Sequence, residues 1–171
     1  MGRAGNGVDE FAVPSEAARR YIARLIADCR LRQRPIVFDT QVLIGYIEDR
    51  EPITALLAPL IEGPDLPIAI SVVTLAEVLV LPVRNDDLSL VATLRRSISN
   101  LPGMTVVPLD VEIAVETALV RGRIGLPLPD AAIIATARVV NSVGLIGNDR
   151  RWRAKALGAP YHHLDDIIAL A

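Results

Sequence analysis

The sequence of 171 residues contains little cysteine and little lysine. Its single cysteine, Cys29, excludes an internal disulfide and fits a reducing compartment, so we expect a cytoplasmic protein. Of the 18 basic residues only Lys155 is a lysine, which leaves 17 arginines. Arginine suits bidentate contacts with phosphate, although a GC-rich genome would produce the same bias. The net charge of -2 gives no overall basic field of the kind that indicates nucleic-acid binding.

The chain also lacks long apolar runs that are free of charge. The first thirty residues are interrupted by arginines and hold no segment of signal-peptide type. The most apolar stretch, LPIAISVVTLAEVLVLPV at 66–83, carries Glu77 near its middle and prolines near both ends. A charge at the centre of a spanning helix costs roughly 2.5–3.5 kcal/mol. We therefore expect a buried strand followed by a buried helix here, and no membrane segment.

With 51% hydrophobic and 22% charged residues, the chain has the composition of one globular domain. Short β-branched runs alternate with helical patterns, and the runs are apolar on both faces. This alternation predicts a three-layer α/β/α fold with a short parallel sheet. The expected strands are 36–38, 68–70, 105–107 and 143–146, with a weaker one near 161–164. The expected helices are 41–47, 53–61, 73–81, 88–99, 111–121, 131–140 and 151–156.

A further amphipathic helix is expected before the first strand. It begins at Pro14-Ser15, and its apolar face repeats at the helical spacing through Ala18, Ile22 and Cys29. Pro35 ends it, because the residue before a proline is disfavoured in helical conformation. We predict that 1–33 form an N-terminal helical extension and 34–171 the main domain.

Four acidic residues stand near the ends of predicted strands or the starts of predicted helices, and each has an ordinary structural interpretation. Asp39 follows the first strand and could cap the next helix. Glu77 could complete a capping box with Thr74, although a helix beginning at Ser71 would leave Glu77 inside it. Pro129-Asp130 is a good helix start, so Asp130 could be a cap, and Asp149 could be a cap or a turn residue. Taken singly, none of the four requires a functional site.

Taken together, the four acids favour a functional site. The carboxyl ends of parallel strands lie on one edge of a sheet, where such folds bind ligands. Two unit charges 4 Å apart repel by about 4 kcal/mol at an effective dielectric near 20, and no lysine or histidine lies close in sequence to the first three acids. Oxygen ligands without cysteine or histidine select Mg²⁺ or Mn²⁺. Such ions support phosphodiester hydrolysis.

The segments VFDTQVLI, ISVVTLAEVLV, LPDAAIIATA and GNDRRW, in this order, resemble the PIN-domain nucleases, and among them the VapC-like toxin ribonucleases of type II toxin–antitoxin pairs. The resemblance runs from about Pro35 to Asp166. It implies an Mg²⁺- or Mn²⁺-dependent endoribonuclease, a homodimer, and an antitoxin whose basic tail enters the acidic pocket. This chain departs from the family in two ways. It has Gly147 where the family usually has Thr or Ser, and it carries an N-terminal extension that is not typical of the toxins.

The resemblance also assigns roles to individual residues. The catalytic and metal-binding residues would be Asp39, Glu77, Asp130 and Asp149, supported by Thr40 and Asn148. A cluster of basic residues around the third and fourth acids could contact RNA phosphates, although a solvated helix face explains it equally well. Its members are Arg121, Arg123, Arg150, Arg151 and Arg153.

Several alternatives remain open. An RNA-processing nuclease without an antitoxin would carry the same acids, and a catalytically silent PIN-like scaffold would lack one or more of them. A receiver-type phosphoacceptor needs paired acids near the first strand, where this chain has only Asp39. Trp152 could stack a base, but packing in the core is the stronger interpretation. His162 and His163 would point to opposite faces of a strand, so we assign them no metal.

Overall fold

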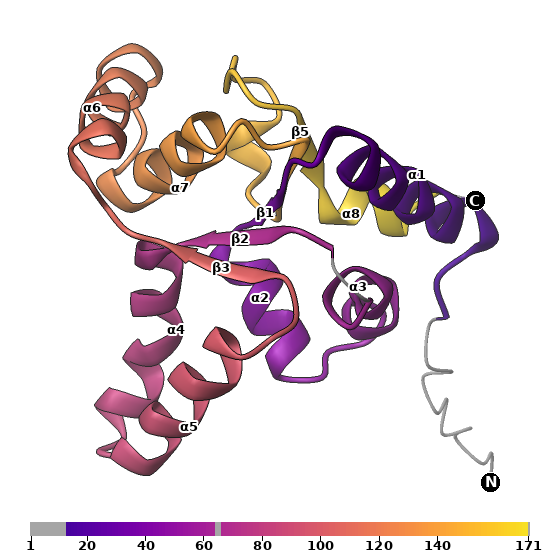
Figure 1. Ribbon diagram of the computed structural model, residues 1–171, viewed down its shortest axis with the longest axis horizontal. Coiled ribbons are helices and arrows are strands. Elements are labelled where there is room, and N and C mark those ends of the chain that lie inside the picture. Colours follow the sequence, from indigo (N-terminus) through magenta and orange to yellow (C-terminus); the bar gives the residue numbers. More distant parts are fainter. Residues whose placement is uncertain (1–12, 64–65, 171) are drawn as a thin grey trace, which may run out of the picture.

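The computed structural model describes residues 13–63 and 66–170 and contains a five-stranded sheet. All strand pairs are parallel, and the order is β3-β2-β1-β4-β5 (Figure 1). The predicted strands, including the weak fifth one, are all present. Their bounds are β1 Ile36–Phe38, β2 Ile68–Ser71, β3 Met104–Val107, β4 Gly144–Gly147 and β5 Tyr161–His163.

Helices cover both faces of the sheet, which confirms the predicted α/β/α layering. Alternate residues of β1 explain the two layers, because successive side chains of a strand point to opposite faces. Val37 packs with α6 and α7, whereas Ile36 and Phe38 pack with the helices on the other face. The helices are α1 Glu16–Arg32, α2 Thr40–Ile47, α3 Ile53–Ile61, α4 Val72–Arg84, α5 Leu88–Ser99, α6 Val111–Ile124, α7 Leu128–Val139 and α8 Leu164–Ile168.

The N-terminal helix α1 belongs to the larger of the two hydrophobic cores. It packs against α3 and α8, and its buried face consists of Ala18, Ile22, Leu25 and Cys29. Ser15 caps it as expected, accepting a hydrogen bond from the Ala18 N–H at 3.0 Å. Because this helix shares its core with β1, the division into an extension at 1–33 and a domain at 34–171 stays a prediction.

The apolar stretch 66–83 forms a strand and a helix, as expected. β2 is fully buried, and α4 follows it directly. Among the residues described, no helix has the length and apolar composition that crossing a bilayer requires.

In the C-terminal third, one predicted helix is absent from the structure and one helix of the structure was not predicted. The expected helix at 151–156 is wrong, since only a short 3₁₀ turn, η1 Arg150–Trp152, forms there. The buried side chain of Trp152 anchors this turn in the smaller core. The short helix α8, which begins directly after β5, has no counterpart among the predicted helices.

Candidate acidic active site

Asp39 caps α2 and lies at the carboxyl end of the central strand β1. Its side chain accepts a hydrogen bond at 2.7 Å from the N–H of Thr40, the first residue of the helix. The residue is nonetheless only 6% exposed. A buried carboxylate with few neutralising contacts is costly, so capping alone does not account for its position.

Glu77 projects from the second turn of α4 toward the same strand end. Ser71 caps α4 through the Val73 N–H, so the capping box between Thr74 and Glu77 is wrong and the alternative start is confirmed. The Glu77 carboxylate instead accepts a hydrogen bond from the Thr40 hydroxyl. This contact joins the helix after β2 to the helix after β1.

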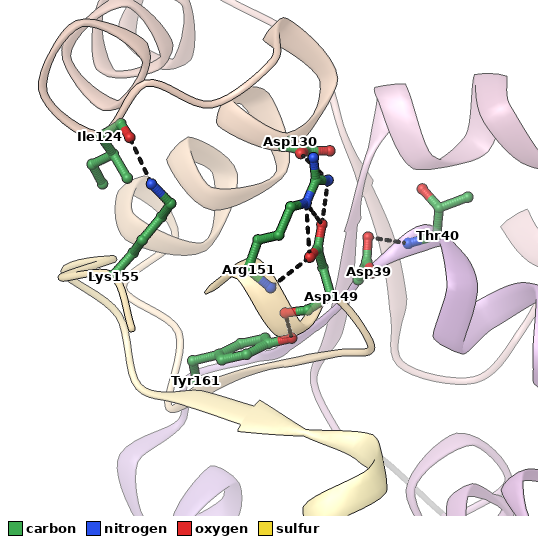
Figure 2. Close-up of polar contacts among 8 residues, drawn as sticks. All are labelled: Asp39, Thr40, Ile124, Asp130, Asp149, Arg151, Lys155 and Tyr161. Carbon is green, nitrogen blue, oxygen red and sulfur yellow. Dashed lines mark hydrogen bonds and ion pairs between the residues drawn. The ribbon is translucent and has the colours of Figure 1, made fainter. Parts of the chain in front are cut away.

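Asp130 lies inside the first turn of α7 rather than at its cap. The cap position is occupied by Pro127, which has no side-chain hydrogen bond, so the cap interpretation of Asp130 is wrong. Asp149 does cap η1, accepting from the Arg151 N–H at 2.8 Å. Figure 2 shows the two carboxylates facing each other across the Arg151 guanidinium.

The four acids line one shared cavity of about 320 Å³ at the carboxyl end of the sheet. They come from four separate segments, and the sheet order brings them together because β2 and β4 flank β1. The other residues that line the cavity are Thr40, Gln41, Asn148, Arg150, Arg151 and Trp152.

The electrostatics of the cavity divide the acids into two groups. Burial raises the pKa of Asp39 to about 6, against hydrogen bonds from the N–H groups of Thr40 and Asn148 that lower it. Burial also raises the pKa of Asp130, and the neighbouring Arg151 opposes that rise. By contrast, hydrogen bonds from Arg151 lower the pKa of Asp149. Asp39 therefore has no basic side chain bonded to it, whereas the Arg151 guanidinium bonds both Asp130 and Asp149.

The donor set fits a hard divalent cation. All four side chains offer carboxylate oxygens, and neither cysteine nor histidine lines the cavity. Within residues 13–63 and 66–170, however, no three side chains of Asp, Glu, His or Cys come close enough to form a ready metal-binding group. The chemistry of the ligands suits Mg²⁺ or Mn²⁺, and the acids would have to draw together around the ion.

Three of the five arginines predicted to bind RNA are paired with carboxylates. Arg150 contacts Asp165 at 2.9 Å and Arg153 contacts Asp166 at 2.6 Å, while Arg151 bonds two acids of the cavity. The remaining two, Arg121 and Arg123, lie exposed in the last turn of α6, and no ion pair involves either within the described residues. A role of all five in RNA binding stays a prediction.

Trp152 and the two histidines pack into the structure. Trp152 is 1% exposed and contacts the Tyr161 ring at a centroid distance of 5.6 Å, which confirms the packing interpretation. His162 bonds the Tyr21 hydroxyl at 2.7 Å, and His163 bonds the Arg153 side chain at 2.9 Å. Each histidine thus has a structural partner.

Tyr161 is a residue of the site that the sequence did not indicate. Its hydroxyl donates to the backbone carbonyl of Asp149 at 3.0 Å (Figure 2). A Cβ placed at Gly147 would lie 2.9 Å from the Tyr161 ring and 3.3 Å from the Asp39 Cβ. The missing side chain at Gly147 therefore leaves room for the tyrosine, which takes up the space and supports the segment that carries Asp149. The pairing of a glycine with an aromatic fourteen positions later has no recognisable sequence pattern.

Comparison with protein-family models gives a match to the PIN domain over residues 36–157, which is more than half of the chain. The chain belongs to the PIN domain family. The matched region includes all four acids of the cavity. A comparison with curated proteins found no match.

Solved structures, one of them a toxin–antitoxin complex, share their fold with this chain. A toxin–antitoxin complex from Klebsiella pneumoniae is 25% identical, with a TM-score of 0.58 over 71% of this chain and 93% of that one. FitAcB from Neisseria gonorrhoeae is also 25% identical, with a TM-score of 0.58 over 75% and 96%. VapBC2 from Rickettsia felis, bound to a promoter DNA fragment, is 13% identical with a TM-score of 0.60 over 75% and 97%, and shows the fold alone.

Proposed function

We propose that this PIN domain is a metal-dependent endoribonuclease that cleaves RNA phosphodiester bonds and acts as the toxin of a toxin–antitoxin pair. The observation that carries the proposal is the convergence of Asp39, Glu77, Asp130 and Asp149 on one cavity, from four segments of a PIN domain. Capping is a local role for Asp39 and Asp149, but it explains neither the burial of Asp39 nor the positions of Glu77 and Asp130. A shared ligand explains all four.

Mg²⁺ or Mn²⁺ bound by these acids would polarise the scissile phosphate and lower the pKa of the attacking water. The protein itself supplies the orientation. The Thr40 hydroxyl donates to Glu77 and holds its carboxylate toward the cavity, while N–H groups of Thr40 and Asn148 fix Asp39. Such supporting hydrogen bonds keep ligands in productive geometry.

The decisive experiment replaces two of the acids with neutral isosteres. We expect Asp149→Asn and Glu77→Gln to reduce cleavage of a mixed RNA pool in Mn²⁺ by about 100-fold or more, because losing even an outer supporting group at a metal site costs 10–100-fold. Asn caps a helix about as well as Asp, so Asp149→Asn should fold normally. Asp110→Asn is the matched control, since Asp110 caps α6 through the Ile113 N–H at 2.9 Å and does not line the cavity.

The outcome separates the proposal from its alternatives. Wild-type-like cleavage by both variants would refute the proposed active site. RNA binding by the wild-type protein without any cleavage would instead support a catalytically silent scaffold. Cleavage without a binding partner encoded by a neighbouring gene would favour an RNA-processing nuclease.

An antitoxin partner is supported by the similarity to the toxin–antitoxin complexes and by an apolar groove beside the cavity. The groove has a volume of about 230 Å³ and lies between α2, α4 and α5. Leu81, which lines it, is 58% exposed, and Glu77 lines both the groove and the acidic cavity. A small antitoxin could therefore place an apolar helix in the groove and a basic tail among the acids.

Binding of the partner is tested by co-purification. We expect Leu81→Asp to weaken capture of the protein encoded beside this gene without changing RNA cleavage in the absence of that protein. We further propose a homodimer in the cytoplasm, which light scattering on the purified chain would test.

A further inference from the structure

One guanidinium bonds two acids of the cavity. The Arg151 Nε lies 3.0 and 2.9 Å from the two carboxylate oxygens of Asp149, and its Nη2 lies 3.2 Å from the Asp130 Oδ2 (Figure 2). The Nη2 also pairs with Asp149. Arg151 therefore links the first turn of α7 to the segment that follows β4.

The backbone of η1 holds Arg151 in this position. Asp149 caps the turn through the Arg151 N–H, and the buried Trp152 anchors the next residue in the core. The Arg151 side chain then folds back over the carboxylate that caps its own turn. The neighbouring Arg150 lines the cavity as well, but its guanidinium pairs with Asp165 and bonds neither Asp130 nor Asp149. Two adjacent arginines thus have different partners.

The atoms that Arg151 bonds are the same oxygens that a divalent cation would need from Asp130 and Asp149. A carboxylate oxygen that accepts one or two guanidinium hydrogens offers less electron density to a metal ion. The two cations therefore compete for one set of ligands.

The side chain of Arg151 can leave the cavity at small cost, because it is 64% exposed already. An exposed ion pair contributes little to stability, since water and salt screen it. A divalent ion held by several carboxylates gains much more from the same oxygens. The exchange of one cation for the other is thus favourable once the metal is present at a sufficient concentration.

We propose that Arg151 is the internal counter-cation of the metal-free cavity and that the divalent ion displaces it on binding. Arg151 in this role sets the metal concentration at which the site fills. The inference rests on the proposed function, because it takes the four acids to be metal ligands.

Arg151→Gln tests the proposal in the full-length protein, with Arg150→Gln as the matched control for the loss of one positive charge beside the cavity. Without its competitor the ion should bind more tightly, so we expect the dissociation constant for Mn²⁺, measured by calorimetry, to fall about three- to tenfold in Arg151→Gln relative to Arg150→Gln. Arg151→Lys should lie between the two, since lysine keeps the charge but lacks the bidentate fork. Fluorescence of Trp152, the sole tryptophan, gives an independent titration with Mg²⁺.

Melting in chelator provides the second measurement. Removal of the counter-cation leaves Asp130 and Asp149 to repel each other, so Arg151→Gln should melt about 2–4 °C below Arg150→Gln without metal. The difference should vanish or reverse in saturating Mn²⁺. Equal Mn²⁺ affinity in the two variants would overturn the role of Arg151 and leave the nuclease proposal standing. Failure of the wild type and of Arg151→Gln to bind Mn²⁺ would overturn both proposals.

Discussion

Replacement of Asp39 by asparagine should stabilise the metal-free protein while abolishing its activity. Burial raises the pKa of Asp39 from its ordinary value of 3.8 to about 6. Each pKa unit corresponds to about 1.4 kcal/mol, so keeping this carboxylate ionised costs the folded protein about 3 kcal/mol at neutral pH. Asparagine removes the charge and retains the shape, and it still accepts the Thr40 N–H as a helix cap.

The expected gain is smaller than the full cost of ionisation. Asp39 receives hydrogen bonds from the N–H groups of both Thr40 and Asn148, whereas asparagine has a single acceptor oxygen. Losing one such bond costs about 1 kcal/mol. We therefore expect Asp39→Asn to be more stable by about 1–2 kcal/mol in chelator at pH 7, which raises the melting temperature by about 2–8 °C.

The pH dependence gives the sign of the effect. Below pH 4 the carboxyl is largely protonated in both folded and unfolded states, so Asp39→Asn should be less stable than wild type by about the 1 kcal/mol of the lost hydrogen bond. As the pH rises from 4 to 6 the unfolded chain loses this proton first, so wild-type stability falls relative to the variant. Above pH 6 both states are ionised and the difference stays constant. The assay is urea denaturation in chelator at pH 4, 5, 6 and 7.

Asp110→Asn is the control, because it exchanges a helix cap that is exposed and lies outside the cavity. Its stability should follow the wild type at every pH. An Asp39→Asn variant that is less stable than wild type at pH 7 would refute the argument that burial makes this carboxylate costly. Retained cleavage of RNA in Mn²⁺ would show that Asp39 is a cap alone.

Three further predictions concern the metal, the glycine and the first helix. Mn²⁺ at one hundred times its dissociation constant should stabilise the wild type by about 2.7 kcal/mol, measured by thermal melting, and Asp39→Asn should gain much less; tight Zn²⁺ binding instead would contradict an all-oxygen site. Gly147→Ser should lose about 1–3 kcal/mol in urea denaturation, because its Cβ would overlap the Tyr161 ring; unchanged stability would refute that close approach. Deletion of 1–33 should lower stability strongly, because α1 shares the main core, yet leave cleavage within a few-fold; loss of all activity in a folded truncated protein would place α1 in the active site.

The sequence predicts the strands well because parallel strands buried on both faces must be apolar throughout. β1 at Ile36–Phe38 lies as expected, and the other three firmly predicted strands differ from the structure by at most one residue at each end. The same apolar patterns identify the helices that pack over the sheet. Helix α8 was missed because five residues are too few to display a periodicity.

The predicted helix at 151–156 fails for a reason that lies in the packing. Its residues favour helix by propensity, but Trp152 and Leu157 are both buried in the smaller core. Positions five apart on an α-helix point about 140° away from each other. A helix continued through Leu157 could not bury both side chains against the same core, whereas the turn η1 followed by an irregular segment buries both.

The four acids could be named from the sequence, whereas Arg151 and Tyr161 could be assigned their contacts only from the structure. A cap motif shows where a carboxylate starts a helix, but not whether a neighbouring segment approaches it. The bond from Arg151 to Asp130 spans 21 positions, and the Tyr161 ring meets Gly147 across adjacent strands. Such contacts depend on strand order, which apolar patterns do not encode.

Strand order also explains how Asp39 can cap a helix and share a cavity with the other acids. From β1 the chain builds β2 and β3 on one side and then returns to place β4 on the other, so the order reverses beside β1. Asp39 follows β1 at this point, between the helix that carries Glu77 and the segment that carries Asp149. Capping fixes the Asp39 carboxylate by one hydrogen bond to Thr40, and the reversal of strand order surrounds it with the other acids. The cap interaction therefore also holds the Asp39 carboxylate at the cavity, so capping and the proposed role as a metal ligand are compatible in one residue.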